Sequence, residues 1–126
     1  MYEIAIEETF DAAHCLPDDS GNCRRLHGHT YRVRVAFRRR DPDESGMAID
    51  FRHAKTVLRE AVGYLDHQYI NDLPEFSSQN PTAENIARFI YEQMRAQDLP
   101  IFSTTVWETP TSCATYFESD ASGFAV

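Results

Sequence analysis

The stretch "CRRLHGHTYRVRV", residues 23–35, combines a cysteine, two histidines separated by one glycine, and a regular alternation of residue types. From residue 27 on, the odd positions carry histidine, tyrosine and valine, whereas the even positions carry glycine, threonine and arginine. Side chains of a β-strand point alternately to two faces, so the stretch predicts a strand with one apolar and one polar face. Both histidines stand at the start of the apolar face. Histidine is uncommon among apolar side chains, so a chemical role is a reasonable explanation for the pair.

The N-terminal segment shows the same alternation. Its even positions, from Tyr2 to His14, carry most of the apolar side chains, and the turn-rich segment "PDDSGN", residues 17–22, follows. We therefore expect two strands, over residues 1–14 and 27–37, that pair antiparallel as a hairpin. Such a hairpin brings His14, at the end of its first strand, close to the two histidines at the start of its second.

Two helices and two further strands are predicted downstream. A helix is expected after Asp50, a favourable N-cap, and its apolar stripe consists of Phe51, Ala54, Val57, Leu58, Ala61, Val62 and Leu65. A second helix begins near Pro81 and Thr82, with the buried stripe Ile86, Phe89, Ile90 and Met94.

Residues 101–109 and 112–119, joined by a turn at Pro110 and Thr111, predict a closing hairpin with Val106 and Glu108 on one face. The order β-β-α-α-β-β predicts an α+β fold, in which two helices cover one face of a four-stranded antiparallel sheet.

The composition predicts one ordinary domain over residues 1–126. The net charge of -8 argues against broad nucleic-acid binding, which depends on Lys and Arg neutralising phosphates. No apolar run reaches the length of a membrane span, the N-terminus lacks the pattern of a signal peptide, and the three cysteines lack paired spacing. We therefore expect a cytoplasmic protein without disulfides and without a membrane partner.

Three histidines that converge from one hairpin are typical of a catalytic zinc site, where imidazoles fill three positions and a fourth stays open. The alternative is a set of polar core or surface histidines, but the shared face of His14, His27 and His29 favours a metal. Cys23, four residues before His27, has two interpretations. As a fourth ligand it would close a structural zinc site of a binding domain; as a free thiol, with its pKa lowered by nearby positive charge, it would be a competent base of an enzyme.

Six ordered segments resemble the 6-pyruvoyltetrahydropterin synthase superfamily in order and spacing; they are "FDAAH", "CRRLHGHTYRV", "GMAIDF", "LDHQYIND", "NPTAENIA" and "WET". The spacing Cys-x-x-x-His-Gly-His is similar to that of its bacterial 6-carboxy-5,6,7,8-tetrahydropterin synthase branch, which serves queuosine biosynthesis. The resemblance implies the tunnelling fold, with a homohexamer built from two trimeric barrels and active sites between subunits.

The same resemblance implies a zinc-dependent lyase that converts 7,8-dihydroneopterin triphosphate to 6-carboxy-5,6,7,8-tetrahydropterin, acetaldehyde and triphosphate. The alternative within the superfamily is 6-pyruvoyltetrahydropterin synthase activity, which stops before the side chain is cleaved. A zinc-stabilised binding domain without catalysis is the alternative outside the enzymes.

The resemblance also implies four residue roles: zinc ligands His14, His27 and His29; catalytic thiol Cys23; proton relay Asp66 and His67; pterin anchor Glu108. An ionised carboxylate suits the anchor because its two oxygens can accept a ring N–H and an exocyclic amino group side by side. Contact between Asp66 and His67 rests on the resemblance alone, and His67 would equally suit a cap at the end of the first helix. His53, Cys15 and Cys113 match no motif and are expected to have no role at the site.

Overall fold

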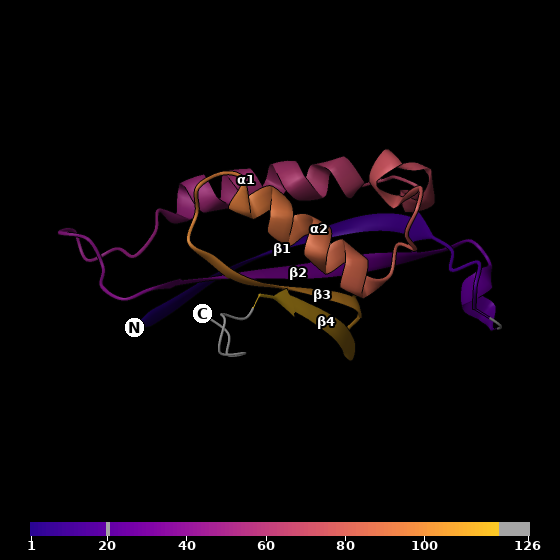
Figure 1. Cartoon of the computed structure of the whole chain (residues 1–126), viewed down its shortest axis with the longest axis horizontal. Helices are drawn as coiled ribbons and strands as arrows, with labels where there is room; N and C mark the ends of the chain where they lie inside the picture. The colour runs from indigo at the N-terminus through magenta and orange to yellow at the C-terminus, as the bar shows by residue number, and fades with distance from the viewer. Residues whose placement is uncertain (20, 119–126) are drawn as a thin grey trace.

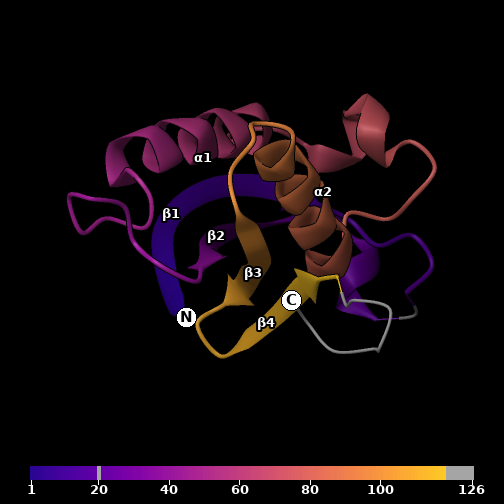
Figure 2. The ribbon, with the colours of Figure 1, turned by 60° about the vertical axis from the view of Figure 1, so that its left-hand side comes forward.

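A sheet and a pair of helices form the two layers of this computed structural model, which describes residues 1–19 and 21–118 (Figure 1). The sheet contains four strands in the order β1-β2-β3-β4, and each strand pairs antiparallel with its neighbours. Both helices cover the same face of the sheet, as Figures 1 and 2 show. The predicted α+β fold and its element order are therefore confirmed. The bounds are β1 (Tyr2–His14), β2 (His27–Arg39), α1 (Phe51–Leu65), α2 (Ala83–Arg95), β3 (Ile101–Thr109) and β4 (Ser112–Phe117).

The β1–β2 hairpin has the predicted pairing. His14 lies opposite His27, and Ala12 lies opposite His29, at the end of the hairpin that leads into the connecting loop. Apolar side chains of the same parity, such as Val33 and Val35, are completely buried under the helices. The three histidines thus continue the buried face of the hairpin beyond its apolar part.

The two helices begin at polar caps that the sequence indicated. The Asp50 carboxylate accepts a hydrogen bond from the Arg52 N–H at 2.9 Å, and the Thr82 hydroxyl accepts one from the Asn85 N–H at 3.2 Å. Their predicted apolar stripes are buried, with one exception. Phe51 is 50% exposed, because it stands in the first turn of α1, where it borders a surface hollow together with Tyr2 and other residues.

The connection between the helices contains features that the sequence did not indicate. Two short 3-10 helices, η2 (Ile70–Asp72) and η3 (Pro74–Phe76), follow α1, and a third, η1 (Asn22–Arg24), lies in the β1–β2 loop. Just after α1 the chain runs along the outer edge of β1, where the His67 N–H donates to the Asp11 carbonyl at 2.6 Å and the Ala13 N–H donates to the Gln68 carbonyl at 2.9 Å. These bonds place Asp66 and His67 beside β1.

None of the helices in the described part of the chain has the length and apolar character needed to span a membrane.

Candidate metal and catalytic site

The three histidines form a compact cluster at the loop end of the β1–β2 hairpin. His14 is completely buried, and His27 and His29 are partly buried. One ring nitrogen from each lies within 4.8 Å of the nitrogens of the other two. The Nε2 atoms of His14 and His27 are only 2.9 Å apart. The predicted convergence of these residues is therefore present in the fold.

The hydrogen bonds on the far side of two rings define which nitrogen faces the cluster. Nδ1 of His14 lies 2.7 Å from the Pro81 carbonyl oxygen, and Nδ1 of His27 lies 2.7 Å from the Arg25 carbonyl oxygen. A carbonyl can only accept, so each Nδ1 donates a proton to it, and Nε2 is the nitrogen of each ring that faces the cluster. This orientation by an outer hydrogen bond is common among metal-ligating histidines.

The cluster fits a metal ion for two reasons. First, the Nε2 atoms of His14 and His27 face each other at 2.9 Å, so both nitrogens point to one place where a cation could be bound. Second, Nε2 of His29 is buried without a hydrogen-bond partner, which is costly for a polar atom unless a ligand occupies it. Three imidazoles are a donor set typical of catalytic zinc.

Burial keeps these imidazoles in the form that binds metal. It lowers the pKa of His14 and of His29, because the charged form loses its hydration. For His14 the hydrogen bond to the Pro81 carbonyl and the charge of Glu108 act in the opposite direction, but burial is the larger effect. Both rings are therefore neutral at neutral pH and have a free lone pair.

Glu108 lies at the edge of the cluster. It stands on β3 two residues after the fully buried Val106, on the same face of the sheet, as predicted. Its Oε1 is 3.9 Å from Nε2 of His14, and its side chain is 29% exposed. A carboxylate in this position can interact with a polar ligand bound next to the histidines.

Cys23 lies outside the group of metal-capable side chains. It is exposed in η1, and among the described residues the metal-capable group at this end of the hairpin contains the three histidines alone. This favours the interpretation of Cys23 as a free thiol over that of a closing ligand.

The groups around Cys23 raise the pKa of its thiol rather than lower it. A hydrogen bond between the Cys23 side chain and Asp19 raises the pKa of the thiol, and the negative charges of Asp19 and Glu108 act in the same direction. The interpretation of Cys23 as a base required nearby positive charge to lower this pKa, and the sequence left the directions of the neighbouring arginine side chains open. The local charge at the sulfur comes from an aspartate four residues earlier, so the resting thiol is protonated.

Asp66 and His67 touch each other, as the resemblance implied. Nδ1 of His67 lies 2.9 Å from Oδ2 of Asp66, and Oδ1 of Asp66 accepts a hydrogen bond from the Asp11 N–H at 2.9 Å. Both interactions lower the pKa of Asp66, the bond from Asp11 most strongly. His67 adopts a left-handed backbone conformation with φ of 58°, and Asp66, not His67, is the C-cap of α1. His67 thus follows the C-cap directly, and its ring contacts the Asp66 carboxylate.

Asp11, Asp66 and His67 form a second cluster of their own. Asp11 is exposed, whereas Ala12 and His14 on the same strand are buried. The Asp11 side chain therefore lies on the face of β1 opposite to the one that carries His14. Sequence reasoning missed Asp11, Asp19 and these two carbonyls. For Asp19, the sequence offered one signal, the adjacent acidic residues Asp18 and Asp19 shortly before Cys23. No sequence signal indicated Asp11 or the two carbonyls.

The other histidine and cysteine residues that the sequence analysis considered, His53, Cys15 and Cys113, lie outside the site. His53 and Cys113 are exposed. Cys15 is partly buried, and its Sγ lies 3.0 Å from the Tyr69 hydroxyl. None of the three belongs to either cluster.

Comparisons with known proteins identify the family and agree with the fold. Residues 3–119 match the family model described as 6-pyruvoyl tetrahydropterin synthase. The chain is 41% identical over 123 residues to a 6-carboxy-5,6,7,8-tetrahydropterin synthase of Synechocystis sp., covering 93% of this chain and 94% of that relative. It is 35% identical to a protein of the same name from Haemophilus influenzae, covering 94% of this chain and 100% of that relative. A solved structure of Caenorhabditis elegans 6-pyruvoyl tetrahydropterin synthase superimposes with a TM-score of 0.83 at 26% identity, covering 94% of this chain and 98% of that one.

Proposed function

We propose, because the chain belongs to the 6-pyruvoyl tetrahydropterin synthase family, that it is the zinc-dependent lyase that forms 6-carboxy-5,6,7,8-tetrahydropterin for queuosine biosynthesis. Its substrate is 7,8-dihydroneopterin triphosphate, and the other products are acetaldehyde and triphosphate. The observation that carries the proposal is the similarity, over most of the chain, to relatives named for this product. Three cysteines without a disulfide fit a reducing compartment, and we place the activity in the cytoplasm.

His14, His27 and His29 hold the zinc ion in this proposal. When bound, zinc supplies a Lewis acid that stabilises negative charge on a substrate oxygen. The support within the fold is the neutral state of the buried rings, the fixed direction of two of them, and the unpartnered Nε2 of His29.

Glu108 binds the pterin ring. Its carboxylate is partly buried next to the histidine cluster, so a ring anchored there has its side chain within reach of the metal ligands. The two oxygens accept the ring N–H and the exocyclic amino group. Partial burial strengthens these charge-assisted bonds because water screens them less.

Cys23 takes the proton from carbon, and the Asp66–His67 pair moves protons at the substrate side chain. Because the resting Cys23 thiol is protonated, it must first lose its proton, and, since the side chain is exposed, that proton passes to solvent water. The Asp66 carboxylate orients the His67 ring through Nδ1, which leaves Nε2 to exchange protons with the substrate.

The two clusters lie on opposite faces of the β1–β2 hairpin, and we propose that neighbouring copies of the chain complete each site. The metal cluster lies on the face of the hairpin that the helices cover, whereas Asp66 and His67 attach to the outer edge of β1. The homohexamer of two trimeric barrels is the assembly that we propose. The edge strand β4 and the part of β1 before Asp11 offer backbone groups for such pairing.

Product analysis tests the reaction. Zinc-loaded protein is incubated with 7,8-dihydroneopterin triphosphate, and acetaldehyde and the pterin product are measured together. We expect acetaldehyde in equal amount to 6-carboxy-5,6,7,8-tetrahydropterin. Turnover without acetaldehyde would instead assign 6-pyruvoyltetrahydropterin synthase activity, and absence of any turnover in the zinc-loaded protein would favour a binding domain.

The zinc site is tested by elemental analysis. We expect one zinc ion per chain in the parent and loss of zinc in a variant that carries both His27→Ala and His29→Ala. His53→Ala is the matched control, because His53 is exposed on α1 and belongs to neither cluster. Full zinc retention by the double variant would exclude the assignment.

A further inference from the structure

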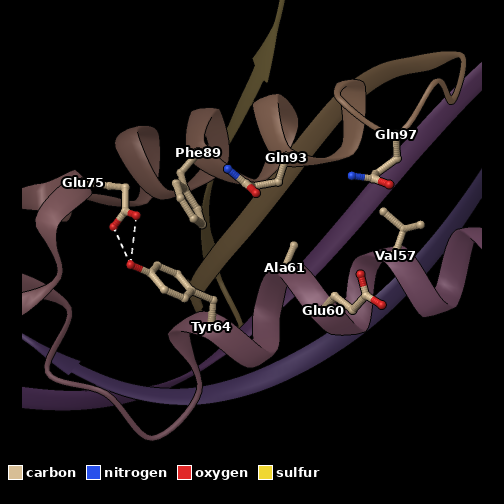
Figure 3. A pocket seen from close by; sticks show the side chains of 8 residues that line it. All are labelled: Val57, Glu60, Ala61, Tyr64, Glu75, Phe89, Gln93 and Gln97. Carbon is tan, nitrogen blue, oxygen red and sulfur yellow. Dashed lines mark hydrogen bonds between the residues drawn. The ribbon is translucent and has the colours of Figure 1, made fainter.

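A groove between α1 and α2 takes no part in the proposed reaction. It encloses about 260 Å³ between the facing sides of the two helices (Figure 3). Its floor is apolar and consists of Val57, Ala61 and Phe89, which are 6%, 7% and 8% exposed.

One end of the groove is closed by an aromatic wall. The rings of Tyr64 and Phe89 are stacked, with centroids 5.9 Å apart and planes inclined by 26°. The Tyr64 hydroxyl lies 2.8 and 2.7 Å from the two carboxylate oxygens of Glu75 in η3 (Figure 3). A phenol has one proton, so it satisfies one lone pair at a time, and the carboxylate retains acceptor capacity for a second donor.

The groove is acidic. Glu60 and Glu75 line it together with the amide side chains of Gln93 and Gln97, and none of its described lining residues is Lys, Arg or His. Arg88, which lines an adjoining hollow, is already paired with Glu92 at 3.1 Å. The negative charge of the groove is therefore not compensated from that side.

We propose that this groove binds a small organic cation, in which a primary ammonium or guanidinium group is attached to an alkyl or aryl body. The apolar floor removes the body from water, and the carboxylate of Glu75 accepts a charge-assisted hydrogen bond from the cationic group. The Tyr64 and Phe89 rings add attraction for the cation. The volume lies just below the range of drug-sized pockets, which selects a small ligand.

The groove remains accessible in the proposed assembly. Glu60, Tyr64, Gln93 and Gln97 are exposed on the helix layer, whereas the proposed pairing of copies uses the edges of the sheet. The inference does not depend on the proposed reaction, and its test requires no turnover.

The test compares three ligands with a phenyl body and different charges. Full-length, zinc-loaded protein is titrated with 2-phenylethylammonium, with neutral 2-phenylethanol and with anionic 3-phenylpropanoate at constant ionic strength. Side-chain amide resonances of Gln93 and Gln97 report on the groove. We expect saturable shifts with the cation, binding at least tenfold weaker with the alcohol, and no saturation with the anion.

Two variants test the acidic residues. Glu75→Gln is expected to weaken cation binding roughly three- to tenfold, because a charged acceptor is replaced by a neutral one of similar shape. Glu44→Gln is the control, since Glu44 is exposed in the loop before α1, away from the groove, and should leave the affinity unchanged. Equal affinity for the cation and the alcohol, unshifted groove resonances, or unchanged affinity when Glu60→Gln and Glu75→Gln are combined would each overturn the proposal.

Discussion

At the scale of single residues, the role of Cys23 decides whether the protein is an enzyme or a domain with a structural zinc site. If it is the base, Cys23→Ala keeps zinc and fold, because the thiol lies outside the histidine cluster, but turnover falls by roughly 10²- to 10⁴-fold. If it is a ligand, the same change lowers both zinc content and melting temperature. Cys15→Ala is the matched control and should do neither. Zinc content, melting temperature and rate are measured for the three proteins side by side, and zinc loss in Cys23→Ala would exclude the catalytic role.

Asp19 controls the protonation of the same thiol. Its hydrogen bond and its charge raise the pKa of Cys23, so Asp19→Asn should lower that pKa toward its ordinary value. More thiolate is then present at a given pH, and iodoacetamide should alkylate Cys23 faster across the pH range below its pKa. The control is Asp41→Asn, an exposed aspartate after β2. An alkylation profile identical to that of the parent would show that Asp19 does not act on the sulfur.

At the scale of elements, the β1–β2 hairpin makes stability depend on pH through its buried histidines. Burial lowers the folded-state pKa of His14 and His29 below the ordinary value of 6.5. Above pH 6.5, His14 and His29 are neutral in both the folded and the unfolded protein, so they contribute no pH dependence to stability. As the pH falls below 6.5, the unfolded protein binds protons at these histidines before the folded protein does. Stability of the metal-free protein should therefore fall as the pH drops from about 6.5 toward the lower folded-state values.

Melting temperatures of metal-free protein between about pH 7.5 and about pH 5.5 measure this effect. His29→Gln should reduce the slope of melting temperature against pH, because one of the titrating groups is removed. His53→Gln should leave the slope unchanged, since His53 is exposed. A slope that is the same in the parent and in His29→Gln would contradict the role of burial.

Local patterns predicted the elements, because each depends on residues that are neighbours in the sequence. Alternation in residues 27–35 indicated β2 and the shared face of its histidines, and Asp50 marked the start of α1. The attachment of Asp66 and His67 to β1 depends on hydrogen bonds to the backbone of Asp11, which is 55 residues from Asp66 in the chain, and a local sequence pattern carries no information about such distant contacts. The protonation of Cys23 was missed for a related reason, because it depends on how the β1–β2 loop folds.

At the scale of the whole molecule, the separation of the two clusters predicts a site shared between copies. The chain should sediment as a hexamer, and a stable monomer at micromolar concentration would contradict this assembly. The edge at β4 and the part of the β1 edge that precedes Asp11 remain for pairing in the isolated chain, since the segment after α1 bonds the β1 edge at Asp11 and Ala13. A symmetric oligomer repeats the same contact, so each copy both provides and receives one cluster.

Complementation between two inactive variants measures that sharing. Cys23→Ala removes the thiol and His67→Ala removes the relay, and each should be inactive alone. When the two are unfolded together and refolded in equal amounts, random assembly gives about a quarter of the sites an intact thiol from one copy and an intact relay from its neighbour. Activity should then return to roughly a quarter of the parent value. If one chain supplied both groups to the same site, every site would lack one of them, and the mixture would remain as inactive as its components.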